Sequence, residues 1–464
     1  MNVMRNGVVG LIAVVGWMPA VAAAADLRVA EAVERNDAAA VAALLSEGAD
    51  VNAAQPDGAT ALHWAAHWDG VDIAGRLLRA GAAVDAVNEL GLAPLSVACR
   101  NGSAKMVETL LSGGADARAA EPSGETALMT CARTGSLGAV ERLLAGGADP
   151  NARERVSGQT ALMWAVAGSH TTVARTLVDA GAAVEARSNG AFTPLLFAAR
   201  AGVLDAARLL VEEADADVNA MTADGLSPLL VASASLEAIT GSDYRLVREP
   251  SRHEALGIFL LDRGADVHQA DQFGMTPLHY AVEVGKPALL RVLLAYEADP
   301  NRQLTRGLPF RRGDYVGRGA YNGATPFWLA ARLGDLEAMR ALLAAGADPE
   351  LPSARGVTPL MVAAGLTQSD SRMVAETLLL DAVRMLVLEC GADIHAVDRG
   401  GQTAVHGAAN VSGDAIITFL VEQGANPMAA DRRGRTPLDV ATRTLRPRPR
   451  TAALLRELAG TSGH

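Results

Sequence analysis

Three histidines form the most regular pattern of chemically active side chains in this 464-residue chain. His63, His279 and His406 each stand three residues after a threonine. Imidazole can ligate a metal or act as a general base. However, a position that recurs this regularly indicates a hydrogen-bonding role that the fold repeats, rather than a metal site.

Two further segments match ligand-binding loops only in part. The run Asp215–Asn219 begins like a calcium loop, but Ala220 replaces the required glycine and Leu226 the required glutamate. The glycines of Gly317–Gly323 do not have the spacing of a phosphate-binding loop. The three cysteines also fit no metal-binding spacing. We therefore predict no metal, no cofactor and no enzymatic activity.

A basic, aromatic segment at residues 303–320 is better suited to binding another macromolecule. It places Arg311, Arg312 and Tyr315 within a few residues of one another, in a chain whose formal net charge is −11. Arginine and aromatic side chains are enriched at the energetic centres of protein interfaces. We name these three as candidate partner-binding residues; the alternative is a solvated loop with ordinary charges.

An internal repeat sets the elements that must position these residues. A short motif, typically Thr followed by Ala or Pro and then Leu, recurs with its first residue as an anchor. The anchors are Thr60, Ala93, Thr126, Thr160, Thr193, Ser227, Thr276, Thr325, Thr358, Thr403 and Thr436. From Thr60 to Ser227 the steps are 33, 33, 34, 33 and 34 residues. A fixed period of this size predicts a stacked array whose repeats share one continuous core.

The second half of each repeat is equally regular. Paired apolar residues follow the anchor by about 17 residues, and Gly-Ala-Asp segments such as Gly48–Asn52 and Gly147–Asn151 come next. With the anchors, this pattern resembles the ankyrin repeat across residues 26–460. The resemblance implies an all-α solenoid of about 12 helix pairs with short β-hairpin-like fingers. It also implies a non-catalytic protein that binds other proteins.

Local chemistry agrees with this assignment. Proline after the anchor suits the first turn of a helix, and the anchor threonine can cap it. Glycine in Gly-Ala-Asp ends the second helix in a left-handed conformation. Asp215 and Glu297 occupy that glycine position in two repeats. Because glutamate tolerates this conformation poorly, we expect strain or an altered helix end at Glu297.

The resemblance implies a recognition surface as well. The seventh and eighth residues after an anchor should face a concave groove, and the residues just before an anchor should lie on a finger. The partner-binding candidates at these positions are Trp68, Arg100, Arg133, Arg200, Leu92, Phe192, Leu226, Phe273 and Met275. Together they would form an apolar strip beside scattered arginines. The alternative is that these side chains pack finger against finger.

Insertions interrupt the period near residues 236–252, 303–320 and 366–378. Repeat arrays place insertions in loops, often on the binding face. The first and third should separate the two helices of a repeat, and the second should lengthen a finger.

Residues 1–25 have the features of a secretory signal peptide. Arg5 precedes the apolar run Gly7–Trp17, and small residues end the segment at Ala22–Ala25. Cleavage there would make Asp26 the first mature residue. The alternative is an uncleaved anchor, since the uncharged stretch is about long enough to span a bilayer. Pro19 and the alanine-rich end favour cleavage.

These features predict a periplasmic or secreted binding protein. We expect a monomer without stable membrane insertion after cleavage, whose partners are one or more proteins. The net charge and the export signal argue against nucleic acid as a partner. The alternative function is a secreted effector or inhibitor that binds a host or competitor protein.

Overall fold

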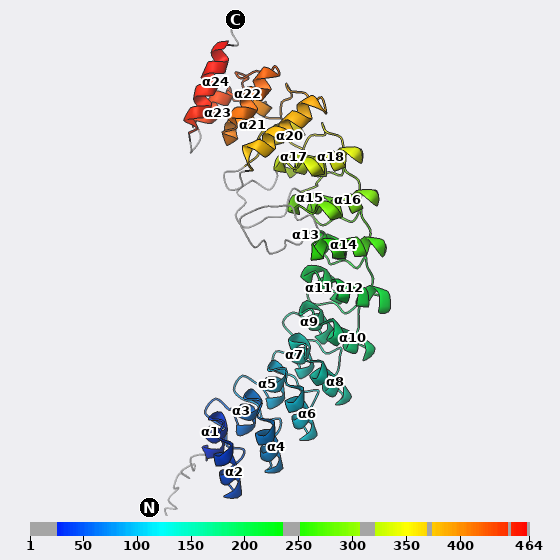
Figure 1. Cartoon of the computed structure of the whole chain (residues 1–464), viewed down its shortest axis with the longest axis vertical. Coiled ribbons are helices and arrows are strands. Elements are labelled where there is room, and N and C mark those ends of the chain that lie inside the picture. Colours follow the sequence, from blue (N-terminus) through cyan, green and yellow to red (C-terminus); the bar gives the residue numbers. More distant parts are fainter. Residues whose placement is uncertain (1–25, 235–250, 307–320, 369–373, 444–446, 462–464) are drawn as a thin grey trace, which may run out of the picture. The chain divides into compact units, whose positions relative to one another are not determined.

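The computed structural model describes residues 26–234, 251–306, 321–368, 374–443 and 447–461. Contacts divide the chain into two compact units, residues 1–116 and 117–464. Within each unit the helices follow one another in pairs. The described residues form no strand, and their one β-bridge is isolated, between Ala120 and Thr126. The predicted all-α array of about 12 helix pairs is confirmed (Figure 1).

The first unit contains three pairs. Their helices are α1 (Arg28–Glu34), α2 (Ala38–Ser46), α3 (Ala61–His67), α4 (Val71–Arg79), α5 (Pro94–Arg100) and α6 (Ala104–Ser112). The first helices of successive pairs pack on one another, and so do the second helices, which gives two layers. The core between the layers is built from small side chains such as Ala65 and Ala66, both fully buried.

In the described part of the second unit, nine pairs follow in the same order. The first helices are α7 (Ala127–Thr134), α9 (Ala161–Ala167), α11 (Pro194–Ala201), α13 (Pro228–Ala234), α15 (Pro277–Val284), α17 (Pro326–Leu333), α19 (Pro359–Ala363), α21 (Ala404–Val411) and α23 (Pro437–Arg443). The second helices are α8 (Leu137–Ala145), α10 (Thr171–Asp179), α12 (Leu204–Arg208) with the π-helix η1 (Leu209–Glu213), α14 (Arg252–Asp262), α16 (Pro287–Ala295), α18 (Leu336–Ala344), α20 (Glu376–Leu388), α22 (Asp414–Glu422) and α24 (Pro449–Thr461).

The anchors begin the first helices as their sequence predicts. Thr193 caps α11 by accepting a hydrogen bond from the Leu196 amide at 3.4 Å, and Pro194 occupies the first turn. Thr325 caps α17 in the same way, through the Trp328 amide at 3.1 Å. Each cap satisfies a backbone donor that the helix itself leaves unpaired.

Left-handed residues end the second helices, including the two that are not glycine. Asp215 and Glu297 have φ angles of 53° and 62°, in the same region as Gly264 at 86°. Helix α16 nevertheless ends where its neighbours do, so Glu297 carries strain without an altered helix end. The altered end lies instead before Asp215. That repeat has one extra residue, and the π-helix η1 absorbs it.

Candidate functional site

The three repeated histidines are structural. His63 lies beside the Thr60 hydroxyl at 2.9 Å through Nδ1, and beside the Leu92 carbonyl oxygen of the next repeat at 2.8 Å through Nε2. His406 makes the matching contacts with Thr403 and with the Arg435 carbonyl oxygen. The predicted hydrogen-bonding role is therefore confirmed. In these two repeats the histidine at the fourth position of the motif joins one repeat to the next.

Burial keeps these imidazoles neutral. Burial lowers the pKa of His279 to about 4, and it also lowers the pKa of His63 and of His406. His279 is fully buried, and backbone groups of Ala324 and Arg302 oppose part of the lowering of its pKa. No group of histidine, cysteine or acidic side chains in the described part of the chain could hold a metal ion.

The calcium-like segment Asp215–Asn219 also joins repeats. The Asn219 amide donates to the Gly264 carbonyl at 3.1 Å, and its oxygen accepts from the Asp266 amide at 2.8 Å. Asn52, Asn151 and Asn301 make the same pair of contacts with the repeat that follows each of them. We call this contact pair the asparagine tie.

In the first unit, the end of α3 carries an exposed aromatic cluster. Trp68 is 50% exposed and donates its indole N–H to the Glu34 carbonyl at 3.0 Å. The His67 ring touches it edge-on, with ring centroids 4.8 Å apart. Arg100 is exposed at the end of α5. Both predicted candidates therefore lie on the surface, on backbone that is well anchored.

In the second unit, the two arginines predicted at the ends of first helices are both exposed. The Arg133 guanidinium lies over the Trp164 ring, 5.0 Å from its centroid, and pairs with the Glu125 carboxylate at 3.4 Å. Arg200 takes part in no ion pair in the part of the chain that the structure describes. Only its backbone oxygen is engaged, by His253 at 3.2 Å.

The predicted apolar strip before the anchors is only partly on the surface. Leu92 is 8% exposed and Met275 is fully buried, so their prediction as exposed binding residues is wrong. This position is drawn inward because it lies against the preceding repeat, where the Leu92 carbonyl meets the His63 ring. Phe192, Leu226 and Phe273 are half-buried and keep part of their side chains accessible.

The remaining candidates lie outside the described residues. Arg311, Arg312 and Tyr315 fall in residues 307–320, between the finger after α16 and the start of α17. Most of the first predicted insertion, and the middle of the third, likewise fall outside the described residues.

Comparison with known proteins decides the family. Models of ankyrin repeats in three copies match residues 29–121, 95–188 and 372–458. A model of ankyrin repeats in many copies matches residues 260–308, and the single-repeat model matches residues 192–223 and 322–354. This chain is an ankyrin repeat protein.

Among curated proteins, the chain is similar to neurogenic locus notch homolog protein 1. Identity to the Danio rerio protein is 34% over 214 residues, which is 44% of this chain and 7% of that protein. Identity to the Xenopus laevis protein is 31% over 213 residues, or 43% of this chain and 7% of that one. The similarity thus covers a small part of these relatives. The crystal structure of the human ASB11 ankyrin repeat domain matches with a TM-score of 0.43 and 26% identity, covering 51% of this chain and 98% of that one.

Sequence reasoning missed the ankyrin-repeat position that carries Trp164, four residues after its anchor. The ring is half-buried, and its Nε1 atom is buried without an acceptor among the described residues. Phe197 holds the same position in the next repeat and meets Phe192 edge-on, with centroids 5.8 Å apart. Comparing the residues that lie four positions after each anchor would have found both rings.

Three arginines on the fingers of consecutive ankyrin repeats were missed as well. Arg155 donates to the Pro122 carbonyl at 3.2 Å, and Arg187 donates to the Met221 carbonyl at 2.8 Å. Arg153 donates to the Gly158 carbonyl at 3.1 Å and also to the Arg187 carbonyl. Because these acceptors are neutral backbone oxygens, the positive charges of the three side chains stay uncompensated.

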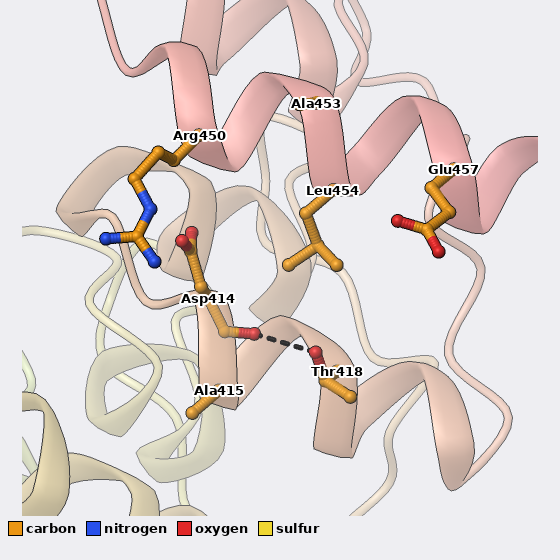
Figure 2. Close-up of a pocket in the computed structure, with 7 residues that line it drawn as sticks. All are labelled: Asp414, Ala415, Thr418, Arg450, Ala453, Leu454 and Glu457. Atoms are coloured by element: carbon orange, nitrogen blue, oxygen red, sulfur yellow. Dashed lines mark hydrogen bonds between the residues drawn. The ribbon is translucent and has the colours of Figure 1, made fainter.

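The cavity near the C-terminal end of the array contains none of the predicted residues. It has a volume of about 490 Å³ and lies between α22 and α24 (Figure 2). Its wall carries Asp414, whose carboxylate accepts a hydrogen bond from the Thr451 hydroxyl at 2.6 Å. The cavity is wide open to solvent, and Arg450 and Glu457 also line it.

Proposed function

We propose that this ankyrin repeat protein acts outside the cytoplasm as a scaffold that binds another protein. Ankyrin repeats are protein-interaction modules that generally lack catalytic activity, and the repeats account for most of the described chain. The proposal places binding on the ends of the first helices and on the fingers.

One observation carries the proposal. Arg100, Arg133 and Arg200 stand seven residues after their anchors and Trp68 eight residues after Thr60, so all four lie at the ends of first helices, and all four are exposed. Helices α7 and α11, which carry Arg133 and Arg200, begin at the threonine caps of Thr126 and Thr193, so binding would order few additional backbone groups. Large aromatic and arginine side chains on a rigid surface are typical of interface hot spots.

Co-purification tests this function. We expect the tagged protein to retain a specific partner, and the variants Arg133→Ala and Arg200→Ala each to weaken that complex about tenfold. A deletion of residues 304–319 tests the inserted segment in the same assay. If the partner bound all three variants as tightly as the parent, binding through these surfaces would be refuted.

Export is the second part of the proposal, and it rests on the sequence of residues 1–25. No helix among the described residues has the length and apolarity to cross a bilayer. N-terminal sequencing of the native protein should return Asp26 or a residue within one or two positions of it. A sequence beginning at Met1 would favour the anchored alternative.

The secreted effector or inhibitor remains the second candidate, because the same leader would also begin export to the medium. Fractionation separates the two. A protein retained in the periplasm, with its partner in the same fraction, supports the scaffold. Accumulation in the culture supernatant supports the effector.

A further inference from the structure

Trp164 lies at the centre of a surface on the second unit that we define by six residues. The Trp164 surface consists of Arg133, Trp164, Phe192, Phe197, Arg200 and Leu226. Its members come from α7, α9, α11 and the adjoining fingers, and these first helices pack on one another in order. Within it, the guanidinium of Arg133 covers the indole ring, and the two phenyl rings meet edge-on.

The charge of this surface is opposite to that of the whole chain. The formal net charge of the chain is −11. Around the Trp164 surface, however, Arg200 and the finger residues Arg153, Arg155 and Arg187 have no carboxylate partner among the described residues. Glu125 pairs with Arg133 at 3.4 Å, and Glu154 accepts the Val156, Ser157 and Gln159 amides of its own finger. The surface therefore keeps an excess of positive charge, contributed by Arg200 and the finger arginines.

The indole N–H adds a polar group to this surface. Its nitrogen has no acceptor among the described residues. An unsatisfied buried donor is unfavourable, so a ligand that supplied an acceptor would gain from it. The surface thus combines apolar rings, positive charge and an N–H donor without an acceptor. A ligand that complements it would carry an apolar group, negative charge and a hydrogen-bond acceptor.

We propose that the Trp164 surface binds an extended, acidic segment of a partner protein. This inference rests on the proposed scaffold function and gives the partner its chemistry. One apolar side chain of the segment lies against Trp164 and the half-buried ring of Phe192. Its carboxylates pair with Arg133 and Arg200, and a backbone carbonyl accepts from the indole N–H once the half-buried ring rotates slightly.

A protein segment fits this surface better than a single-stranded nucleic acid. Bases bind by stacking on open aromatic faces. Here the face of Trp164 is covered by a guanidinium, and Phe197 is only 9% exposed. A long polyanion would also be repelled by the rest of an acidic chain, whereas a short acidic segment meets only the positive region.

Selection from a random 12-residue peptide library displayed on phage tests the proposal. The purified protein should enrich peptides with net negative charge and at least one aromatic or branched aliphatic side chain. The dominant peptide, synthesised with a fluorescent label, then provides a Kd. We expect Arg133→Gln with Arg200→Gln to weaken that Kd at least tenfold, and Trp164→Ala to do the same.

The matched control is Arg291→Gln with Arg340→Gln. Both arginines lie on second helices, where they pair with Glu337 and Glu389 at 2.7 and 2.9 Å. This double variant removes the same charge and should leave the Kd unchanged. Raising the salt concentration should weaken the parent more than the Arg133 and Arg200 variant, because the screened charges are absent from the latter. Trp164→Phe, checked by circular dichroism, provides a ring variant if Trp164→Ala does not fold.

Three results would overturn the proposal. The first is enrichment of neutral or basic peptides, and the second is an acidic peptide whose Kd the Trp164 and arginine variants do not change. The third is a 15-nucleotide oligothymidylate that binds as tightly as the peptide and displaces it, which would assign the surface to nucleic acid. A chain that retains its co-purifying partner but selects no acidic peptide contradicts only this inference, and the scaffold function stands.

Discussion

Two tryptophans at the same repeat position, one in each unit, differ in their hydrogen bonding. Trp64 and Trp164 both stand four residues after an anchor, but Trp64 donates to the Gln55 side chain at 2.7 Å while Trp164 has no acceptor among the described residues. His63 and His279 differ in burial, since His279 is fully buried and His63 is 5% exposed. The glycine of the Gly-Ala-Asp segment is replaced only in the second unit among the described residues, by Asp215 and Glu297.

This difference teaches that the repeat backbone secures the fold without every side-chain bond. Caps, ties and small-residue packing recur in both units, so single positions can lose a partner and the array still forms. A position without such a partner is then either strained or has a polar group that a ligand could bind. Substitutions at these positions distinguish strain from binding capacity.

Acidification should produce the largest difference between the two histidines. His279 has a pKa of about 4 when folded, against about 6.5 when unfolded. The unfolded chain therefore binds the proton more readily, so this stability is complete above pH 6.5 and is lost as the pH falls towards 4. The loss amounts to at most about 3 kcal/mol.

Urea unfolding at pH 7.5 and at pH 5.0 measures this effect. His279→Met, which places a residue that other repeats already use at this position, should remove much of the acid sensitivity. His63→Met is the matched variant in the first unit. Equal acid sensitivity in the parent and in His279→Met would show that buried imidazole is not its source.

Replacing the strained glutamate should have the next largest effect. Glu297→Gly should stabilise the second unit by about 1 kcal/mol, because glycine adopts the left-handed conformation without the steric cost. The reciprocal change, Gly48→Glu in the first unit, should destabilise by a similar amount, since Gly48 has a φ of 74°. Thermal midpoints of both variants test this. An unchanged midpoint for Glu297→Gly would mean that the glutamate is not strained.

The two tryptophans should give the smallest difference. Trp64→Phe removes the hydrogen bond to Gln55, whereas Trp164→Phe removes a donor that has no partner. Both changes lose a similar apolar area, so Trp64→Phe should cost about 0.5 to 1 kcal/mol more than Trp164→Phe. Thermal unfolding followed by circular dichroism compares them. A larger cost for Trp164→Phe would argue that its ring is primarily a core residue.

The repeat made most of the fold predictable from sequence. Each repeated motif predicts a local backbone conformation: the anchors, the prolines that follow them and the Gly-Ala-Asp segments. Because the motifs recur many times, the predictions from different repeats support one another. The left-handed conformation at Glu297 followed from its register alone. The π-helix η1 was not predicted, because one extra residue can be absorbed in a loop or in a helix, and packing decides which.

The candidate site was less predictable, because register gives a position but not its exposure. Trp68, Arg100, Arg133 and Arg200 were placed on the surface correctly. Leu92 and Met275 were not, since their backbones lie against the preceding repeat. The finger arginines were overlooked because a charge count does not say whether a guanidinium faces a carboxylate or a carbonyl.

The asparagine tie has a consequence for how such a chain can change its length. Each tie uses one side chain and two backbone groups, and it reaches only the next repeat. A duplicated repeat that contains a tie would bring its own asparagine and its own glycine carbonyl. It could therefore be inserted while the repeats on both sides of it keep their hydrogen bonds. The number of repeats is therefore a property that recombination can alter in a single step, whereas the chemistry of the exposed register must be altered residue by residue.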